Sequence, residues 1–169
     1  VVGQKNAHLR AHLQVIIFIP VKLYRVSGAV EPEVEAWPSS CCEKKSIAHQ
    51  TCYRHQCFET TKEIVKELGL KEGTYSNSFQ SRLLKDPWLK PYTDFELEKF
   101  PEMGKKKVAV ITPAFVSDCL ETLEEIAMEG EEIFHEMGGE DFTTIPCLND
   151  DAEFVDILSQ WINDWAKAE

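Results

Sequence analysis

The acidic stretch between Cys119 and Phe134 carries the residue types most able to do chemistry. Glu121, Glu125 and Glu129 recur at intervals of four residues, which places their side chains on one face of a helix. Carboxylates in such a row can bind a divalent cation through their oxygen atoms and can accept protons. A solvent-exposed face on an acidic protein has the same spacing. The row by itself therefore predicts either a path for a cation or a charged surface.

The composition predicts one soluble domain. The chain has 169 residues, 43% of them hydrophobic, which is enough for a single core. Its formal net charge of −11 argues against a nucleic-acid-binding protein, because binding to phosphate requires a basic surface. No apolar run reaches the ~20 residues of a membrane span, and no signal peptide is recognisable. We expect a cytoplasmic protein and, since the chain begins at Val1 instead of Met, a piece of a longer one.

Strands and helices alternate along the sequence. The patterns predict strands over 15–19, 74–81, 106–115 and 142–148, and helices over 46–68, 92–100, 117–137 and 151–168. This order favours an α/β fold, a doubly wound and mainly parallel sheet flanked by helices (Rossmann-like). Ligands of such sheets bind beyond the carboxyl ends of the strands. Three segments are expected there, namely 79–82, 113–118 and 147–150.

The helix expected over 117–137 also has an apolar side. Its apolar residues recur at intervals of three and four, which predicts the face that packs on the core. These residues are Leu120, Leu123, Ala127, Phe134 and Met137.

Three motifs together resemble one enzyme family. TPAFVSDCLETLEEIAMEG (112–130), SFQSRLLKDPWLKPYTD (78–94) and IPCLND (145–150) are similar, in this order, to segments of bacterial ferrochelatases. These are lyases of haem biosynthesis that insert ferrous iron into protoporphyrin IX, bound between two chelatase-like lobes. The resemblance implies that residues 46–169 form the C-terminal lobe and that 1–45, with the first strand and loop, diverge. It further implies that the partner is a missing N-terminal lobe, and that the enzyme contacts the membrane surface peripherally.

The resemblance assigns roles to the acidic residues. It implies that Glu121 is the catalytic carboxylate, which handles the metal or the departing pyrrole protons. Asp118, Glu125 and Glu129 would line the path by which Fe²⁺, the metal substrate, enters. It also implies that this helix is locally widened, so that its side chains do not follow regular α-helical spacing.

A second group would contact the porphyrin. The resemblance implies this role for Trp88, Gln80, Ser81 and Arg82. An indole suits the face of a macrocycle, and a guanidinium suits a propionate. On residue type alone, Trp88 is more often an aromatic that fills the core, and Arg82 an ordinary surface residue.

One family motif is absent. The resemblance predicts that the strand at 15–19 runs into a Ser-x-His-Gly loop, whose histidine is the principal group that contacts the metal and the porphyrin. In this chain the strand is followed by PVKLYRV (20–26), and no Ser-x-His-Gly sequence occurs in the chain. We therefore expect the chain alone to be a poor catalyst or an inactive one. The alternative is a non-catalytic metal-binding or tetrapyrrole-binding fragment with the same fold.

Four cysteines lie close together in the sequence. A cytoplasmic location makes disulfides among them unfavourable. They could ligate a [2Fe–2S] cluster, as in some bacterial ferrochelatases, or a zinc ion together with His49 or His55, or they could be unliganded thiols. The four are Cys41, Cys42, Cys52 and Cys57.

Overall fold

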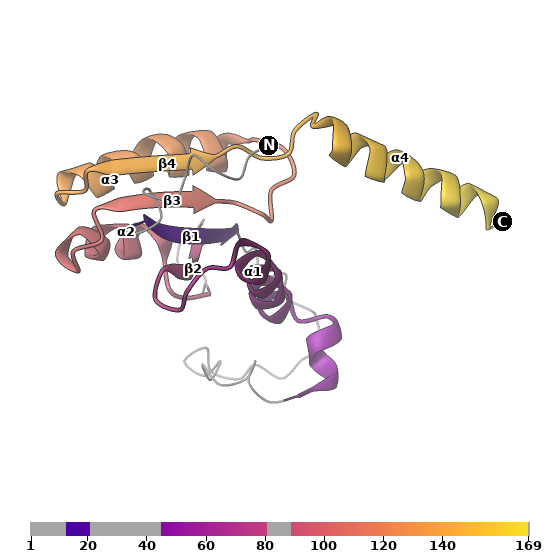
Figure 1. Ribbon diagram of the computed structural model, residues 1–169, viewed down its shortest axis with the longest axis horizontal. Coiled ribbons are helices and arrows are strands. Elements are labelled where there is room, and N and C mark those ends of the chain that lie inside the picture. Colours follow the sequence, from indigo (N-terminus) through magenta and orange to yellow (C-terminus); the bar gives the residue numbers. More distant parts are fainter. Residues whose placement is uncertain (1–12, 21–44, 81–88, 169) are drawn as a thin grey trace, which may run out of the picture.

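The computed structural model describes the backbone of residues 13–20 and all atoms of residues 45–80 and 89–168 (Figure 1). Its centre is a sheet of four parallel strands in the order β2-β1-β3-β4. The strands are β1 (Leu13–Pro20), β2 (Tyr75–Gln80), β3 (Lys107–Ile111) and β4 (Asp141–Ile145). The predicted α/β class and parallel sheet are confirmed.

Helix α1 (Tyr53–Leu68) covers one face of the sheet. Cys57 on α1 is buried with Phe79 of β2 and Leu89, and this cluster forms the smaller of the two cores found among the described residues. The helix ends where predicted, because Gly69 adopts a left-handed conformation (φ 61°) and its N–H bonds the carbonyl groups of the last turn. The predicted helix over 46–68 is wrong at its start. A separate 3₁₀ turn, η3 (Ile47–Gln50), precedes α1 and is capped by Ser46.

The larger core lies on the opposite face. Helix α2 (Thr93–Glu102) and the helical segments η4 (Glu121–Glu129) and α3 (Gly130–Glu136) cover that face. In β3, Val108 and Val110 point into this core and Ile111 packs with the other, as expected for alternating side chains of a strand. Helices on both faces confirm the doubly wound arrangement. The remaining members of the larger core are Leu97, Phe100, Ile126 and Phe134.

The acidic helix is widened, as the resemblance implied. η4 is a π-helix, and the N–H of Gly130 donates to the carbonyl of Glu125, five residues back. Such segments are rare and occur often at functional sites. In a helix widened in this way, residues four apart stay on one side. The buried residues follow that interval and are Thr122, Ile126, Gly130 and Phe134.

The predicted core face of this helix is therefore largely wrong. Leu120 and Leu123 are 72% and 53% exposed, and Met137 is 41% exposed. The prediction assumed regular α-helical spacing, whereas the π-helical stretch turns Thr122 and Ile126 toward the sheet instead. Only Phe134 of the predicted set is fully buried, and Ala127 is half-buried.

The last helix, α4 (Ala152–Lys167), extends away from the sheet (Figure 1). Asp151 caps its start, since the Asp151 carboxylate accepts a hydrogen bond of 3.1 Å from the N–H of Phe154. No residue of α4 is buried. Within the described parts of the chain, no helix is both long and apolar enough to cross a membrane.

Candidate functional site

Residues from two of the sequence motifs, 78–94 and 112–130, meet near the carboxyl ends of the strands. The chain runs from β1 outward to β2 on one side, and from β3 outward to β4 on the other, so the strand order reverses between β1 and β3. Ligands bind at such reversals in doubly wound sheets. Gln80, the last residue of β2, reaches across this point, and its side-chain N–H group donates to the Glu125 carboxylate of η4 at 3.2 Å. The amide and the carboxylate lie 45 residues apart in sequence.

Glu121 is the first residue of η4 and is half-buried. The thiol of Cys119 donates a hydrogen bond to its carboxylate, and this bond is the main reason why the pKa of Glu121 lies below its usual value. The pKa of Cys119 is raised, chiefly by burial and then by the same bond to Glu121. At neutral pH the pair is therefore a neutral thiol beside an ionised carboxylate that can accept a proton or a cation.

Asp118 joins the loop after β3 to the loop after β4. Its carboxylate accepts hydrogen bonds from the Asn149 amide at 2.7 Å and the Thr122 hydroxyl at 3.1 Å, and a longer one from the N–H of Cys147. Asn149 returns the contact by accepting from the backbone N–H of Asp118 at 2.8 Å. The hydrogen bond from Asn149 is the first cause of the lowered pKa of Asp118. Asp118 thus fixes the start of the acidic helix through contacts within the protein.

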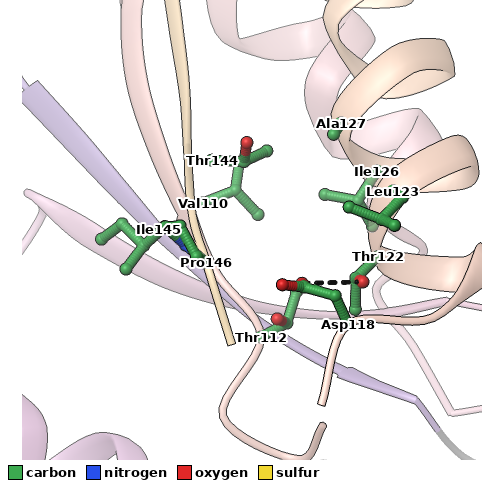
Figure 2. Close-up of a pocket in the computed structure, with 10 residues that line it drawn as sticks. All are labelled: Val110, Thr112, Asp118, Thr122, Leu123, Ile126, Ala127, Thr144, Ile145 and Pro146. Carbon is green, nitrogen blue, oxygen red and sulfur yellow. Dashed lines mark hydrogen bonds between the residues drawn. The ribbon is translucent and has the colours of Figure 1, made fainter. Parts of the chain in front are cut away.

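A small pocket lies between the start of this helix and the sheet (Figure 2). Its volume is about 100 Å³, with Thr112, Asp118 and Thr122 at a polar end and Val110 and Ile126 at an apolar one. Pockets for drug-sized ligands occupy roughly 300–1,000 Å³. A tetrapyrrole therefore does not fit inside this pocket, and a macrocycle bound near Glu121 would lie outside it.

Glu129 lies at the far end of η4 and is exposed, whereas Glu121 and Glu125 are half-buried. The row thus passes from the surface toward the carboxyl edge of the sheet. In the described ranges, no group of three or more His, Cys, Asp or Glu side chains is arranged to hold a metal ion.

Only two of the four clustered cysteines belong to the described residues. Cys57 is 5% exposed within the core, where the Tyr53 side chain forms a hydrogen bond with it, and Cys52 is the residue before α1. The nearby His49 and His55 rings are stacked, with centroids 3.9 Å apart. The Cys57 thiol packs with Phe79 in the smaller core, and its part in a cluster stays a prediction. The zinc interpretation stays a prediction, because two of its four cysteines lie outside the described residues.

Several predicted site residues lie outside the described residues. These are Ser81, Arg82, Trp88, Cys41 and Cys42. Their proposed roles stay predictions.

Sequence reasoning missed the part played by Asn149 and Thr122. Asn149 has a positive φ of 49°, which asparagine tolerates better than most residues, and its N–H bonds the carbonyl of Val116 at 2.9 Å. Its place after the last strand could have signalled a turn at the site. The contact with Asp118, 31 residues earlier, has no local signal.

Comparison with known proteins identifies the family. The family model described as Ferrochelatase matches residues 39–165. The ferrochelatase of Opitutus terrae is 51% identical over 130 residues, which are 77% of this chain and 38% of that protein. The ferrochelatase of Bdellovibrio bacteriovorus is 44% identical over 138 residues, which are 79% of this chain and 41% of that protein. The ferrochelatase of Pseudomonas fluorescens SBW25 is 46% identical over 122 residues, which are 72% of this chain and 36% of that protein. The chain spans about two fifths of the length of these curated relatives. It belongs to the ferrochelatase family.

Proposed function

We propose that this chain is the C-terminal lobe of a ferrochelatase, a lyase of haem biosynthesis that inserts Fe²⁺ into protoporphyrin IX. Membership of the family supports the reaction class. The observation that carries the residue assignment is the placement of Glu121 and Glu125 on a π-helix at the carboxyl edge of the sheet, where Gln80 meets Glu125.

The proposed chemistry follows from the balance of the reaction. Insertion of Fe²⁺ into a free-base porphyrin releases two pyrrole N–H protons and the water ligands of the ion. Glu121, held ionised by the Cys119 thiol, would accept a proton from the macrocycle. A carboxylate oxygen can also replace a water on the cation. The two protons leave in turn, and Glu121 returns its proton to solvent between them.

The other acidic residues would deliver the metal. The exposed Glu129 would receive Fe²⁺ from solvent, and Glu125 would pass it inward. Gln80 would hold the Glu125 carboxylate in one orientation through their hydrogen bond. Asp118 would contribute indirectly, since Asn149 and Thr122 occupy its oxygen atoms. Porphyrin contacts by Gln80, Ser81, Arg82 and Trp88 complete the proposal.

The test uses a chimaera in which residues 39–165 replace the matching segment of the Opitutus terrae ferrochelatase. Glu121→Gln keeps the shape of the side chain but removes its basicity. We expect the rate of zinc or iron insertion to fall by about 10²-fold or more, because a positioned base contributes at least that much. Glu132→Gln, an exposed acid on α3, is the matched control and should leave turnover unchanged. Equal turnover in both variants would remove the proposed role of Glu121.

A non-catalytic porphyrin-binding or metal-binding fragment is the second candidate. The absence of any Ser-x-His-Gly sequence favours it. Titration of the isolated chain with protoporphyrin IX distinguishes the two. A change in porphyrin fluorescence without the absorption spectrum of the metallated product indicates binding alone, whereas appearance of that spectrum indicates catalysis.

Three further features belong to the proposal. We propose a cytoplasmic location on the composition, and we propose peripheral contact with a membrane because the macrocycle of substrate and product is largely apolar apart from its propionates. A [2Fe–2S] cluster on Cys41, Cys42, Cys52 and Cys57 is supported by their number and their closeness in sequence. Iron and sulfide analysis of protein purified without oxygen would decide between a cluster and free thiols.

A further inference from the structure

Met128 on η4 is the most exposed methionine of the chain. The chain has three methionines, and all of them belong to the described residues. Met128 is 68% exposed, Met103 is 65% exposed and Met137 is 41% exposed. Methionine is usually buried, where its flexible thioether fills gaps between other side chains. Met128 belongs to neither core, so packing does not explain its place on the helix.

Carboxylates surround Met128 on the helix. The buried residues of η4 and α3 recur every four residues, so side chains four apart share one side. Glu124 and Glu132 therefore share the side of Met128, and both are exposed. Glu129 follows Met128 directly and forms the neighbouring row with Glu125, along which Fe²⁺ is proposed to enter. An ion that moves along this row passes close to the thioether of Met128.

Met103 has a similar exposure but the opposite electrostatic surroundings. It is the C-cap residue of α2, and Lys99, four residues earlier, forms an ion pair of 2.9 Å with Glu96. Three lysines follow Met103, at positions 105–107. A cation is repelled by these ammonium groups. The chain thus carries two equally accessible thioethers, one among acidic and one among basic side chains.

We propose that Met128 is a modification site, at which hydrogen peroxide oxidises the thioether to a sulfoxide with the help of Fe²⁺ on the neighbouring row; this inference rests on the proposed function. The thioether sulfur gains one oxygen atom and loses two electrons. The O–O bond of hydrogen peroxide breaks, the peroxide is reduced to water, and Fe²⁺ is regenerated. The oxidant arises at the ion, so the nearest exposed thioether reacts first.

The exposure of Met128 makes this modification compatible with the fold. A sulfoxide is polar and disrupts a core when it forms inside one. At Met128 the new oxygen atom lies in water, and neither core changes. Methionine sulfoxide is also reduced back to the thioether by dedicated reductases. Met128 can therefore consume oxidant repeatedly at the place where the metal enters, without unfolding of the chain.

Peptide mapping by mass spectrometry tests the proposal, because it measures the sulfoxide fraction of each methionine in the isolated chain. With hydrogen peroxide alone, Met128 and Met103 should react to similar extents, since susceptibility follows exposure. Addition of Fe²⁺ should raise the ratio of Met128 to Met103 oxidation about tenfold or more, because an ion held beside Met128 has a much higher effective concentration there than in solution. An excess of Zn²⁺, which binds carboxylates but has no redox chemistry, should return the ratio to its value with peroxide alone.

Two double variants with the same charge change provide the control. Glu125→Gln with Glu129→Gln removes the row beside Met128, and the effect of Fe²⁺ on the ratio should be largely lost. Glu67→Gln with Glu98→Gln removes two exposed carboxylates on α1 and α2, and the effect of Fe²⁺ should persist. The melting temperature of the native chain should be the same before and after oxidation of Met128, because this side chain belongs to neither core.

Two results would overturn the proposal. The first is equal oxidation of Met128 and Met103 in the presence of Fe²⁺, and the second is selective oxidation of Met128 that survives loss of both carboxylates of the row. Neither measurement depends on turnover. Equal oxidation together with loss of turnover in Glu121→Gln would remove this inference and leave the proposed function in place. Selective oxidation with unchanged turnover in Glu121→Gln would support this inference and remove the proposed catalytic role of Glu121.

Discussion

The buried face of the π-helix determines where the acidic row points, and one pair of substitutions tests it. Ile126 is 1% exposed in the larger core, whereas Leu123, three residues earlier, is 53% exposed. Ile126→Ala removes about three buried carbon atoms, and at about 0.8 kcal/mol each their transfer costs about 2.5 kcal/mol. The cavity left against Val110 and Phe134 raises the expected loss to about 3–4 kcal/mol.

Leu123→Ala is the matched control on the same helix. About half of the Leu123 side chain is already in water, and removing the rest leaves no closed cavity. We expect a loss of about 1 kcal/mol or less. Urea unfolding of the isolated chain, followed by circular dichroism, gives both values. The melting temperature should fall by about 10 °C for Ile126→Ala and by about 3 °C or less for Leu123→Ala.

The opposite ranking would refute the reasoning. In a regular α-helix with the apolar face that the sequence predicts, Leu123 would be a core residue and Leu123→Ala the costlier change. A larger loss for Leu123→Ala would therefore mean that the helix is not widened in this way. Glu121 and Glu125 would then not lie beside the buried row, and the proposed approach of the metal would lose its geometry.

Two other predictions follow from the contacts at this edge. The hydrogen bond from Asn149 is the first cause of the lowered pKa of Asp118 in the folded chain. This hydrogen bond therefore stabilises the fold fully at pH values above the pKa of Asp118 in the unfolded chain, which is about 4. The stabilisation is lost as the pH falls through the lower pKa that Asp118 has in the folded chain. The difference in melting temperature between the native chain and Asn149→Ala should therefore shrink as the pH falls from 6 to about 3, and a difference that grows toward low pH would contradict this. Gly139→Ala should destabilise the chain by about 1–3 kcal/mol in urea, because a Cβ there would overlap the fully buried Phe134 ring; Glu140→Ala, an exposed neighbour, should change stability little.

The order of strands and helices could be predicted because each element carries its own pattern. The β-branched run at 15–19 lies in the central strand, and Gly69 ends α1 at the residue its type suggests. Boundaries were less accurate where a local turn, and not the apolar pattern, decides them. β3 ends at Ile111, before the turn in which Phe115 bonds the carbonyl of Thr112, so the strand predicted to 115 is too long.

The site was only partly predictable, for two physical reasons. The acidic row was visible from spacing, but its neighbours depend on the widening of the helix, which periodicity does not reveal. The porphyrin contact of Gln80 stays a prediction, and its hydrogen bond to Glu125 was not foreseen because the two segments meet only after the sheet has formed. The amphipathic pattern of α4 predicted a helix correctly. The same pattern is normally evidence of packing on the local core, which α4 does not do.

The central place of β1 has a consequence for how the chain is made. β1 is synthesised before both strands that flank it, and β2 and β3 do not pair with each other. After β2 has paired, the other edge of β1 stays open until the ribosome has delivered residue 107, a loop closure that is slow for entropic reasons. An open edge of this kind is able to pair with other nascent chains. The pace of translation between β2 and β3 therefore bears directly on the yield of soluble protein.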